Sequence, residues 1–189
     1  IDLALLDAQI HAMTHVAMSL LVGGRMPGRA GAVSQATCPW QAFDTADRPI
    51  MLAIGSDPQF RKLAALMDLP DLASDPRFRT NRDRMANRDA LIPRLASAFV
   101  ARGAQHWTDL LGGEGLAAGP INSLEQALAD PQVQARGMVR TLPHPLAGEL
   151  PPVPTPLLFS QPPVPYTPPP PLLAEPTALI AAHPSRGVD

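Results

Sequence analysis

The sequence predicts an α/β chain in which helices supply most of the core. Apolar residues make up 46% of the 189 residues and aromatic residues only 4%, so aliphatic side chains must build the interior, which suits packed helices. Several stretches repeat apolar residues at helical spacing. Two short apolar runs flank the polar turn at residues 44–48, which is the pattern of a β-hairpin.

The first predicted element is a helix over residues 1–21. Apolar residues crowd most of its faces, so we expect it to be largely buried against neighbours. A glycine-rich loop over residues 23–31 ends it. The hairpin follows, with strands at residues 40–43 and 49–54.

Further helices are predicted where apolar residues recur every three or four positions. Ser56 precedes the first of them as a helix cap, and the pair Gly112-Gly113 ends the third. The segment around residues 69–76 is expected to be a loop. The remaining elements are helices over residues 58–67, 88–101 and 104–111, a strand over 116–121, a helix opened by the capping box Ser123–Gln126, and a turn begun by Asp130-Pro131.

The C-terminal part has a different composition. Most of the chain's 24 prolines lie between residues 143 and 184, which predicts an extended segment. Residues 168–171 favour polyproline II, and a strand over residues 156–159 could exist only at a sheet edge.

Bulk properties exclude several classes of function. The net charge is −2 with no run of basic residues, so nucleic acid is not an expected partner. The apolar run near the start falls short of the ~18 residues that a membrane span needs. A single cysteine, Cys38, permits no internal disulfide and fits a cytoplasmic location. The chain begins at Ile1 without a methionine, which we interpret as part of a longer protein.

Isolated reactive residues give weak signals. His11 and His15 stand four apart, a spacing that can hold zinc, but Ala12 replaces the glutamate of a zinc protease and no third ligand is indicated. We therefore predict no metal site. Ser34 and Cys38 have no histidine or aspartate at a spacing that would activate them as nucleophiles.

Short segments in a fixed order carry more information. They are residues 1–9, 24–29 (GRMPGR), 39–47 (PWQAFDTAD), 52–60, 75–81 (DPRFRTN), 87–88, 119–122 (GPIN), 130–133 (DPQV), 136–138 (RGM) and 144–148 (HPLAG). In this order and spacing they resemble the class III CoA-transferase (CaiB/BaiF) family over nearly the whole chain.

This resemblance implies a fold and a domain organisation. Residues 1–36 would be the last helix of a Rossmann-like large domain and the active-site loop. Residues 37–140 would form the small α+β domain, and residues 141–189 an extended proline-rich linker that returns to the large domain. Family members pair as interlocked dimers, so the expected partner is a second copy or a complementary N-terminal half.

The resemblance also implies the chemistry. Family members exchange CoA between carboxylic acids through an aspartyl-CoA intermediate, and the nucleophilic aspartate would lie upstream of Ile1, so no catalytic residue is expected here and the chain alone would be inactive. The active-site loop corresponds to residues 31–35, where Gly31, Ser34 and Gln35 are expected to contact coenzyme A or acyl-CoA as substrate. No tightly bound cofactor is implied. Only one glycine of the family's loop is kept, and the bulkier Ala32, Val33 and Ser34 should restrict the loop.

Two other hypotheses about the function stay open. An α-methylacyl-CoA racemase shares the fold but moves an α-proton with an acid/base pair that would also lie upstream. A non-catalytic partner subunit or remnant is the second. The residues of this chain do not separate these alternatives, whereas an upstream nucleophilic aspartate would indicate transfer.

Overall fold

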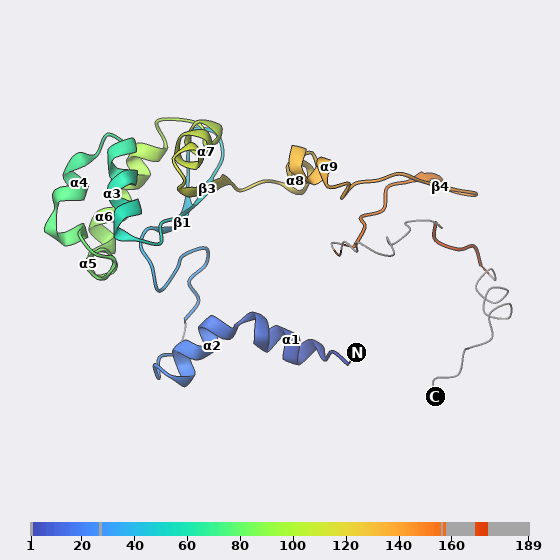
Figure 1. Cartoon of the computed structure of the whole chain (residues 1–189), viewed down its shortest axis with the longest axis horizontal. Coiled ribbons are helices and arrows are strands. Elements are labelled where there is room, and N and C mark those ends of the chain that lie inside the picture. Colours follow the sequence, from blue (N-terminus) through green and yellow to red (C-terminus); the bar gives the residue numbers. More distant parts are fainter. Residues whose placement is uncertain (1, 27, 156, 158–168, 174–189) are drawn as a thin grey trace. The chain divides into compact units, whose positions relative to one another are not determined.

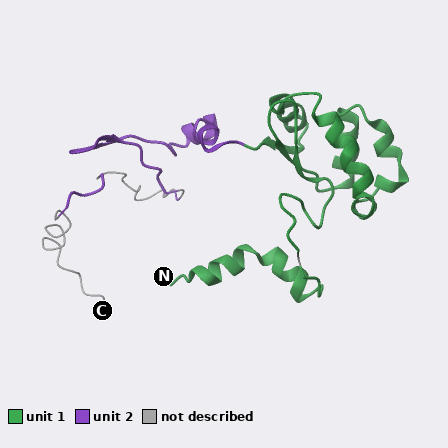
Figure 2. Ribbon diagram, turned by 180° about the vertical axis from the view of Figure 1, so that it is seen from behind, with its two compact units in different colours: residues 1–121 green, residues 122–189 purple. Residues whose placement is uncertain are grey.

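The chain folds as a mixed α/β protein. The computed structural model describes residues 2–26, 28–155, 157 and 169–173, and the elements are labelled in Figure 1. Two compact units divide the chain, residues 1–121 and 122–189 (Figure 2). The first holds helices and a three-stranded antiparallel sheet, and the described residues of the second form two short helices and a two-stranded sheet.

The predicted single helix at the start is two helices, α1 (Leu5–Ala12) and α2 (Thr14–Leu21). Helical geometry is interrupted at Met13, whose ψ of 15° departs from the α value, and the Thr14 hydroxyl donates to the His11 carbonyl there. The prediction that this segment is largely buried is also wrong for the described residues, since neither helix contains a buried residue. Most of its apolar side chains stay exposed among the residues that the structure describes.

The predicted hairpin is confirmed. Strands β1 (Trp40–Phe43) and β2 (Ile50–Ala53) pair antiparallel, with Phe43 opposite Ile50. Strand β3 (Ala117–Pro120), also predicted, pairs antiparallel with β2, so the sheet order is β1-β2-β3. Strand positions alternate, and Phe43, Ile50 and Leu52 turn their side chains into the core.

Six helical segments lie between β2 and β3 and pack beside the sheet (Figure 1). They are α3 (Asp57–Leu66), α4 (Pro70–Ser74), the 3₁₀ helix η1 (Pro76–Phe78), α5 (Asn81–Ala86), α6 (Arg88–Phe99) and α7 (Ala104–Gly113). Ser56 caps α3 as predicted, accepting from the Gln59 N–H. The predicted loop at residues 69–76 is instead helical, because prolines at the first positions of α4 and η1 start new turns.

Helix α7 ends at the predicted glycine pair, with Gly113 as its last residue. Gly115, two residues later, has a φ of 74°, which suits a residue without a side chain. The Leu116 N–H donates to the Leu111 carbonyl at 2.8 Å and the Gly115 N–H to that of Gly112 at 2.9 Å, which together form a Schellman motif. The predicted glycine pair thus ends the helix, and Gly115 in the left-handed conformation completes its C-terminal cap.

One hydrophobic core joins the sheet to these helices. Phe99 lies at its centre, with its ring 4.8 Å from Phe43 and 5.1 Å from Trp107. The buried indole of Trp107 donates to the Phe99 carbonyl at 2.8 Å, so its polar atom is satisfied. The other buried apolar residues are Cys38, Ile50, Leu52, Ile54, Phe60, Leu63, Ala64, Met67, Leu72, Phe78, Leu91, Leu95, Ala104, Leu111 and Leu116. We call residues 38–121 the sheet module.

The second unit contains α8 (Leu124–Leu128), α9 (Pro131–Ala135) and a hairpin of β4 (Leu142–His144) and β5 (Gly148–Leu150). The predicted capping box is confirmed, and so is the turn begun by Asp130, which accepts from two N–H groups. The hairpin was not predicted. The polyproline and edge-strand predictions for residues 168–171 and 156–159 lie wholly or partly outside the described residues. Within the described ranges, no helix has both the length and the apolarity to cross a membrane.

Candidate functional site

The loop before β1 holds all three residues predicted to contact substrate. Gly31 is exposed and adopts a φ of 58°, a conformation that favours glycine. Ser34 is half-buried, and Gln35 is exposed with its side-chain amide donating to the Gly28 carbonyl at 3.1 Å. These residues lie in one loop, which we call the site loop, residues 28–39.

The second half of the site loop is tied to the sheet. Val33 pairs with Gln41 of β1, and the Ser34 N–H donates to the Trp40 carbonyl at 2.9 Å. The Ser34 hydroxyl accepts from the N–H groups of Ala36 and Thr37, each at 3.2 Å. This hydroxyl therefore closes a local turn, a structural use that agrees with the absence of an activating motif.

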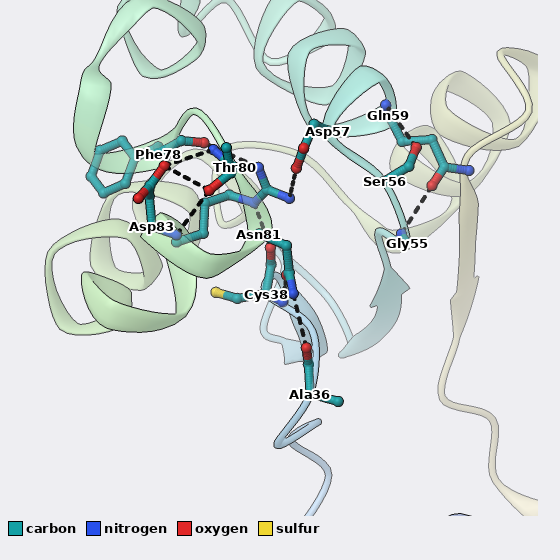
Figure 3. Close-up of polar contacts among 11 residues, drawn as sticks. Ala36, Cys38, Gly55, Ser56, Asp57, Gln59, Phe78, Thr80, Asn81 and Asp83 are labelled. Carbon is teal, nitrogen blue, oxygen red and sulfur yellow. Dashed lines mark hydrogen bonds and ion pairs between the residues drawn. The ribbon is translucent and has the colours of Figure 1, made fainter.

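Side chains from α5 and α6 hold the same half from the other side. Figure 3 shows Asn81 bound to both Ala36 and Cys38: its amide nitrogen donates to the Ala36 carbonyl at 2.9 Å, and its oxygen accepts from the Cys38 N–H at 3.0 Å. The Arg88 guanidinium donates to the Ser34 carbonyl at 3.0 Å and to the Gln41 side chain at 2.8 Å. The loop backbone is thus braced by residues far away in the sequence.

Arg84 is the fully buried charged residue of the sheet module. Its guanidinium donates to the carbonyls of Cys38 at 2.7 Å and Phe78 at 3.1 Å, and pairs with Asp57 at 2.8 Å. The same group lies 4.5 Å from the centre of the Phe60 ring. A buried cation is tolerated when its polar atoms have partners, and each of the three guanidinium nitrogens of Arg84 donates a hydrogen bond here.

Sequence reasoning missed these three bracing residues. Asn81 and Arg88 are the last residues of two family-like segments, 75–81 and 87–88, and Arg84 lies between them. No periodic pattern marks these residues as partners of a loop more than 40 residues away. A helix-cap pattern was present: Thr80 and Asp83 form a capping box that starts α5 and thereby orients Asn81. A capping box predicts where a helix starts, but it does not predict which residues the first turn of that helix contacts.

The residues considered as nucleophiles or metal ligands are not arranged for those roles. Burial raises the pKa of the Cys38 thiol, and the nearby charges of Arg88 and Arg84 lower it by less. The thiol is therefore kept protonated inside the core. In the part of the chain that the structure describes, histidine, cysteine and acidic side chains do not gather in groups of three that could hold a metal ion.

Comparison with known proteins places the chain in a family. A family model described as CoA-transferase family III matches residues 1–177. The chain is 34% identical to human succinyl-CoA:glutarate CoA-transferase, over 95% of this chain and 41% of that protein. It is 35% identical to succinate–glutarate CoA-transferase of Agrobacterium fabrum, over 97% of this chain and 46% of the relative.

A structural match supports the same assignment. A CaiB/BaiF family protein from Brucella suis superposes with a TM-score of 0.78 at 34% identity, over 97% of this chain and 47% of that one. The chain thus spans less than half the length of the relatives it matches. The resemblance inferred from the ordered segments is confirmed, and this chain belongs to CoA-transferase family III.

Proposed function

We propose that this chain is the C-terminal part of an acyl-CoA transferase that moves CoA from a thioester to a free carboxylic acid. The observation that carries the proposal is the family match over residues 1–177 together with the names of the relatives. Two of these proteins are named for succinyl-CoA or succinate with glutarate, and one from Acetobacter aceti for acetyl-CoA with oxalate. Glutarate and oxalate are dicarboxylic acids, so a small dicarboxylate is the acceptor class we propose.

The proposed reaction proceeds through covalent intermediates on an aspartate. The aspartate carboxylate attacks the thioester carbonyl, the CoA thiolate leaves, and a mixed anhydride forms. The thiolate then attacks the aspartyl carbonyl, which gives aspartyl-CoA and releases the first acid. The incoming carboxylate repeats these two steps in reverse, so CoA leaves on the second acid. We place this aspartate upstream of Ile1, and the 189-residue chain by itself then transfers no CoA.

The site loop is the part of this chain that we propose to meet the substrate. Gly31, Ser34 and Gln35 would contact the acyl-CoA, with residues 1–36 belonging to the large domain, 37–140 to the small domain and 141–189 to the returning linker. Support comes from the way the loop is held: its second half is bound to the sheet and to α5–α6, so it offers a preformed surface.

Partner and location follow from the same proposal. A second copy of the full protein, or a complementary N-terminal half, would complete the site, and the exposed apolar residues of α1 and α2 are a surface for such cover. The proposed location is the cytoplasm, where an unpaired buried thiol such as Cys38 stays reduced.

Formation of glutaryl-CoA tests the proposal. The protein that carries this segment at full length and the 189-residue chain are each incubated with succinyl-CoA and glutarate, and products are followed by chromatography. We expect glutaryl-CoA from the full-length protein and none from the chain. Activity of the chain alone would overturn the upstream aspartate, and epimerisation of a 2-methylacyl-CoA without transfer by the full-length protein would favour the racemase.

A further inference from the structure

Three side chains bind alternate carbonyl groups of the site loop. Each carbonyl oxygen accepts from a side chain of α5 or α6, and the three bonds follow one another along the loop. The pairs are Ser34 with Arg88 at 3.0 Å, Ala36 with Asn81 at 2.9 Å, and Cys38 with Arg84 at 2.7 Å. This is a row of hydrogen bonds like that of a paired strand, supplied by side chains.

The three residues do not have the same task. Arg84 is fully buried and also holds Asp57 and the Phe78 carbonyl, so it is part of the module's interior. Asn81 and Arg88 are only half-buried. Their polar atoms are directed to the site loop and to Gln41 of β1, the strand that the loop enters.

The side-chain amide of Asn81 both donates a hydrogen bond to the loop backbone and accepts one from it. Its amide nitrogen donates to Ala36 and its amide oxygen accepts from Cys38, so one side chain satisfies a carbonyl and an N–H on either side of Thr37. Arg88 adds a charge-assisted donor and connects the Ser34 carbonyl to Gln41 through one planar group. Three hydrogen bonds from these two side chains thus hold the backbone of residues 34–38, which contains Gln35, and a fourth joins Arg88 to β1.

We propose that Asn81 and Arg88 are positioning residues of the transfer reaction, which hold Ser34 and Gln35 in a fixed place before the acyl-CoA; this rests on the function proposed above. A loop whose backbone is already held by hydrogen bonds at Ser34, Ala36 and Cys38 need not reorganise when the reaction begins. Loosening it lowers kcat more than it raises KM, because the substrate still binds while the reacting groups are misplaced.

Hydrogen exchange in the 189-residue chain, followed by NMR, tests the bracing without any assay of activity. In Asn81→Ala we expect the Cys38 amide, which loses its acceptor, to exchange about tenfold faster. In Arg88→Gln we expect the Ser34 amide to accelerate similarly. The control is Arg94→Gln, also on α6, which breaks a surface ion pair with Asp71. Unchanged exchange at Ser34 and Cys38 would overturn the proposal.

Kinetics of the full-length protein test the positioning role. We expect Arg88→Gln to lower kcat about tenfold while KM for succinyl-CoA changes less than about threefold, and Arg94→Gln to leave both unchanged. Arg88→Lys keeps the charge but cannot span both acceptors, so it should fold and still lose part of kcat. A wild-type protein that transfers no CoA would refute the proposed function, whereas normal kcat in both Arg88 variants would refute the positioning role alone.

Discussion

Two parts of this chain carry apolar residues at helical spacing, but these residues are buried in one part and exposed in the other. In α6 of the sheet module, Leu91, Leu95 and Phe99 are completely buried. In α1 and α2, Leu5 is 88% exposed and Leu21 is 76% exposed. A periodic pattern predicts which face of a helix is apolar, but it does not predict which other part of the protein packs on that face.

The difference lies in the availability of a partner. The sheet and α7 meet α6 within the module, whereas the apolar side of the N-terminal helices borders an open groove of about 410 Å³. Asp7, Ile10, His11, Thr14, Ala17, Met18 and Leu21 line this groove. In the function proposed here, the remainder of the enzyme supplies that cover, and the sheet module is the part that folds on its own contacts.

Truncating the centre of the core should give the largest effect. Phe99→Ala removes the ring that contacts Phe43 and Trp107, and we expect a loss of about 4 kcal/mol in the free energy of unfolding. The matched variant Met18→Ala, in α2, should cost less than about 0.5 kcal/mol. Urea denaturation measures both. Similar losses at the two positions would abolish the comparison.

Removing the buried cation should give the next largest effect. Arg84→Met leaves Asp57 and the carbonyls of Cys38 and Phe78 without their donor, and we expect a loss of roughly 3 kcal/mol. Arg82→Met changes an exposed arginine on the same helix and serves as the control. If both variants unfold at the wild-type urea concentration, Arg84 does not organise the module.

Each of the two regions contains a serine, one at the start of a helix and one inside a helix. Ser56 caps α3 by accepting from the Gln59 N–H, so Ser56→Ala should cost about 1 kcal/mol. Ser19 lies inside α2, where its hydroxyl donates to the His15 carbonyl at 3.2 Å, and Ser19→Ala should be neutral or slightly stabilising. Thermal unfolding followed by circular dichroism distinguishes them, and equal shifts would contradict the assignment.

Low pH should lower the stability of the sheet module, and this should be the smallest of the effects predicted here. The Ala104 N–H, followed by the Thr45 hydroxyl, lowers the pKa of Asp47 below its ordinary 3.8. A pKa that is lower in the folded state gives stability that is present above the ordinary value and is lost as pH falls through the folded value. Asp47→Asn should therefore unfold with a weaker pH dependence below pH 4 than the wild type. An unchanged pH dependence would show that this carboxylate contributes nothing.

Local sequence patterns predicted the helices and the hairpin that are set by interactions between residues close in the sequence. Ser56, Ser123 and Asp130 marked helix starts, and the turn between residues 43 and 50 marked the hairpin. The bracing of the site loop could not be predicted in this way. Asn81 and Arg88 reach residues 34–38 only because the module brings α5 and α6 beside the loop, and such long-range contacts have no sequence period.

The errors have the same origin. The apolar pattern over residues 1–21 predicted burial, but neither α1 nor α2 contains a buried residue, because a local pattern does not show what packs on a face. The family resemblance contributed what local physics could not, namely the hypothesis that this glycine-containing loop is the one that meets the substrate. Its residues Gly31, Ser34 and Gln35 were found together, and their contact with acyl-CoA stays a prediction.

Hydrogen exchange on the 189-residue chain and on the full-length protein, compared residue by residue, tests the central claim most directly. The claim is that the sheet module is complete in itself and that α1 and α2 require cover from elsewhere. We predict slow exchange of core amides such as Leu52 and Leu95 in both proteins, and slow exchange of Ile10 and Met18 only in the full-length protein. Equal protection of Ile10 and Met18 in the two proteins would contradict the claim.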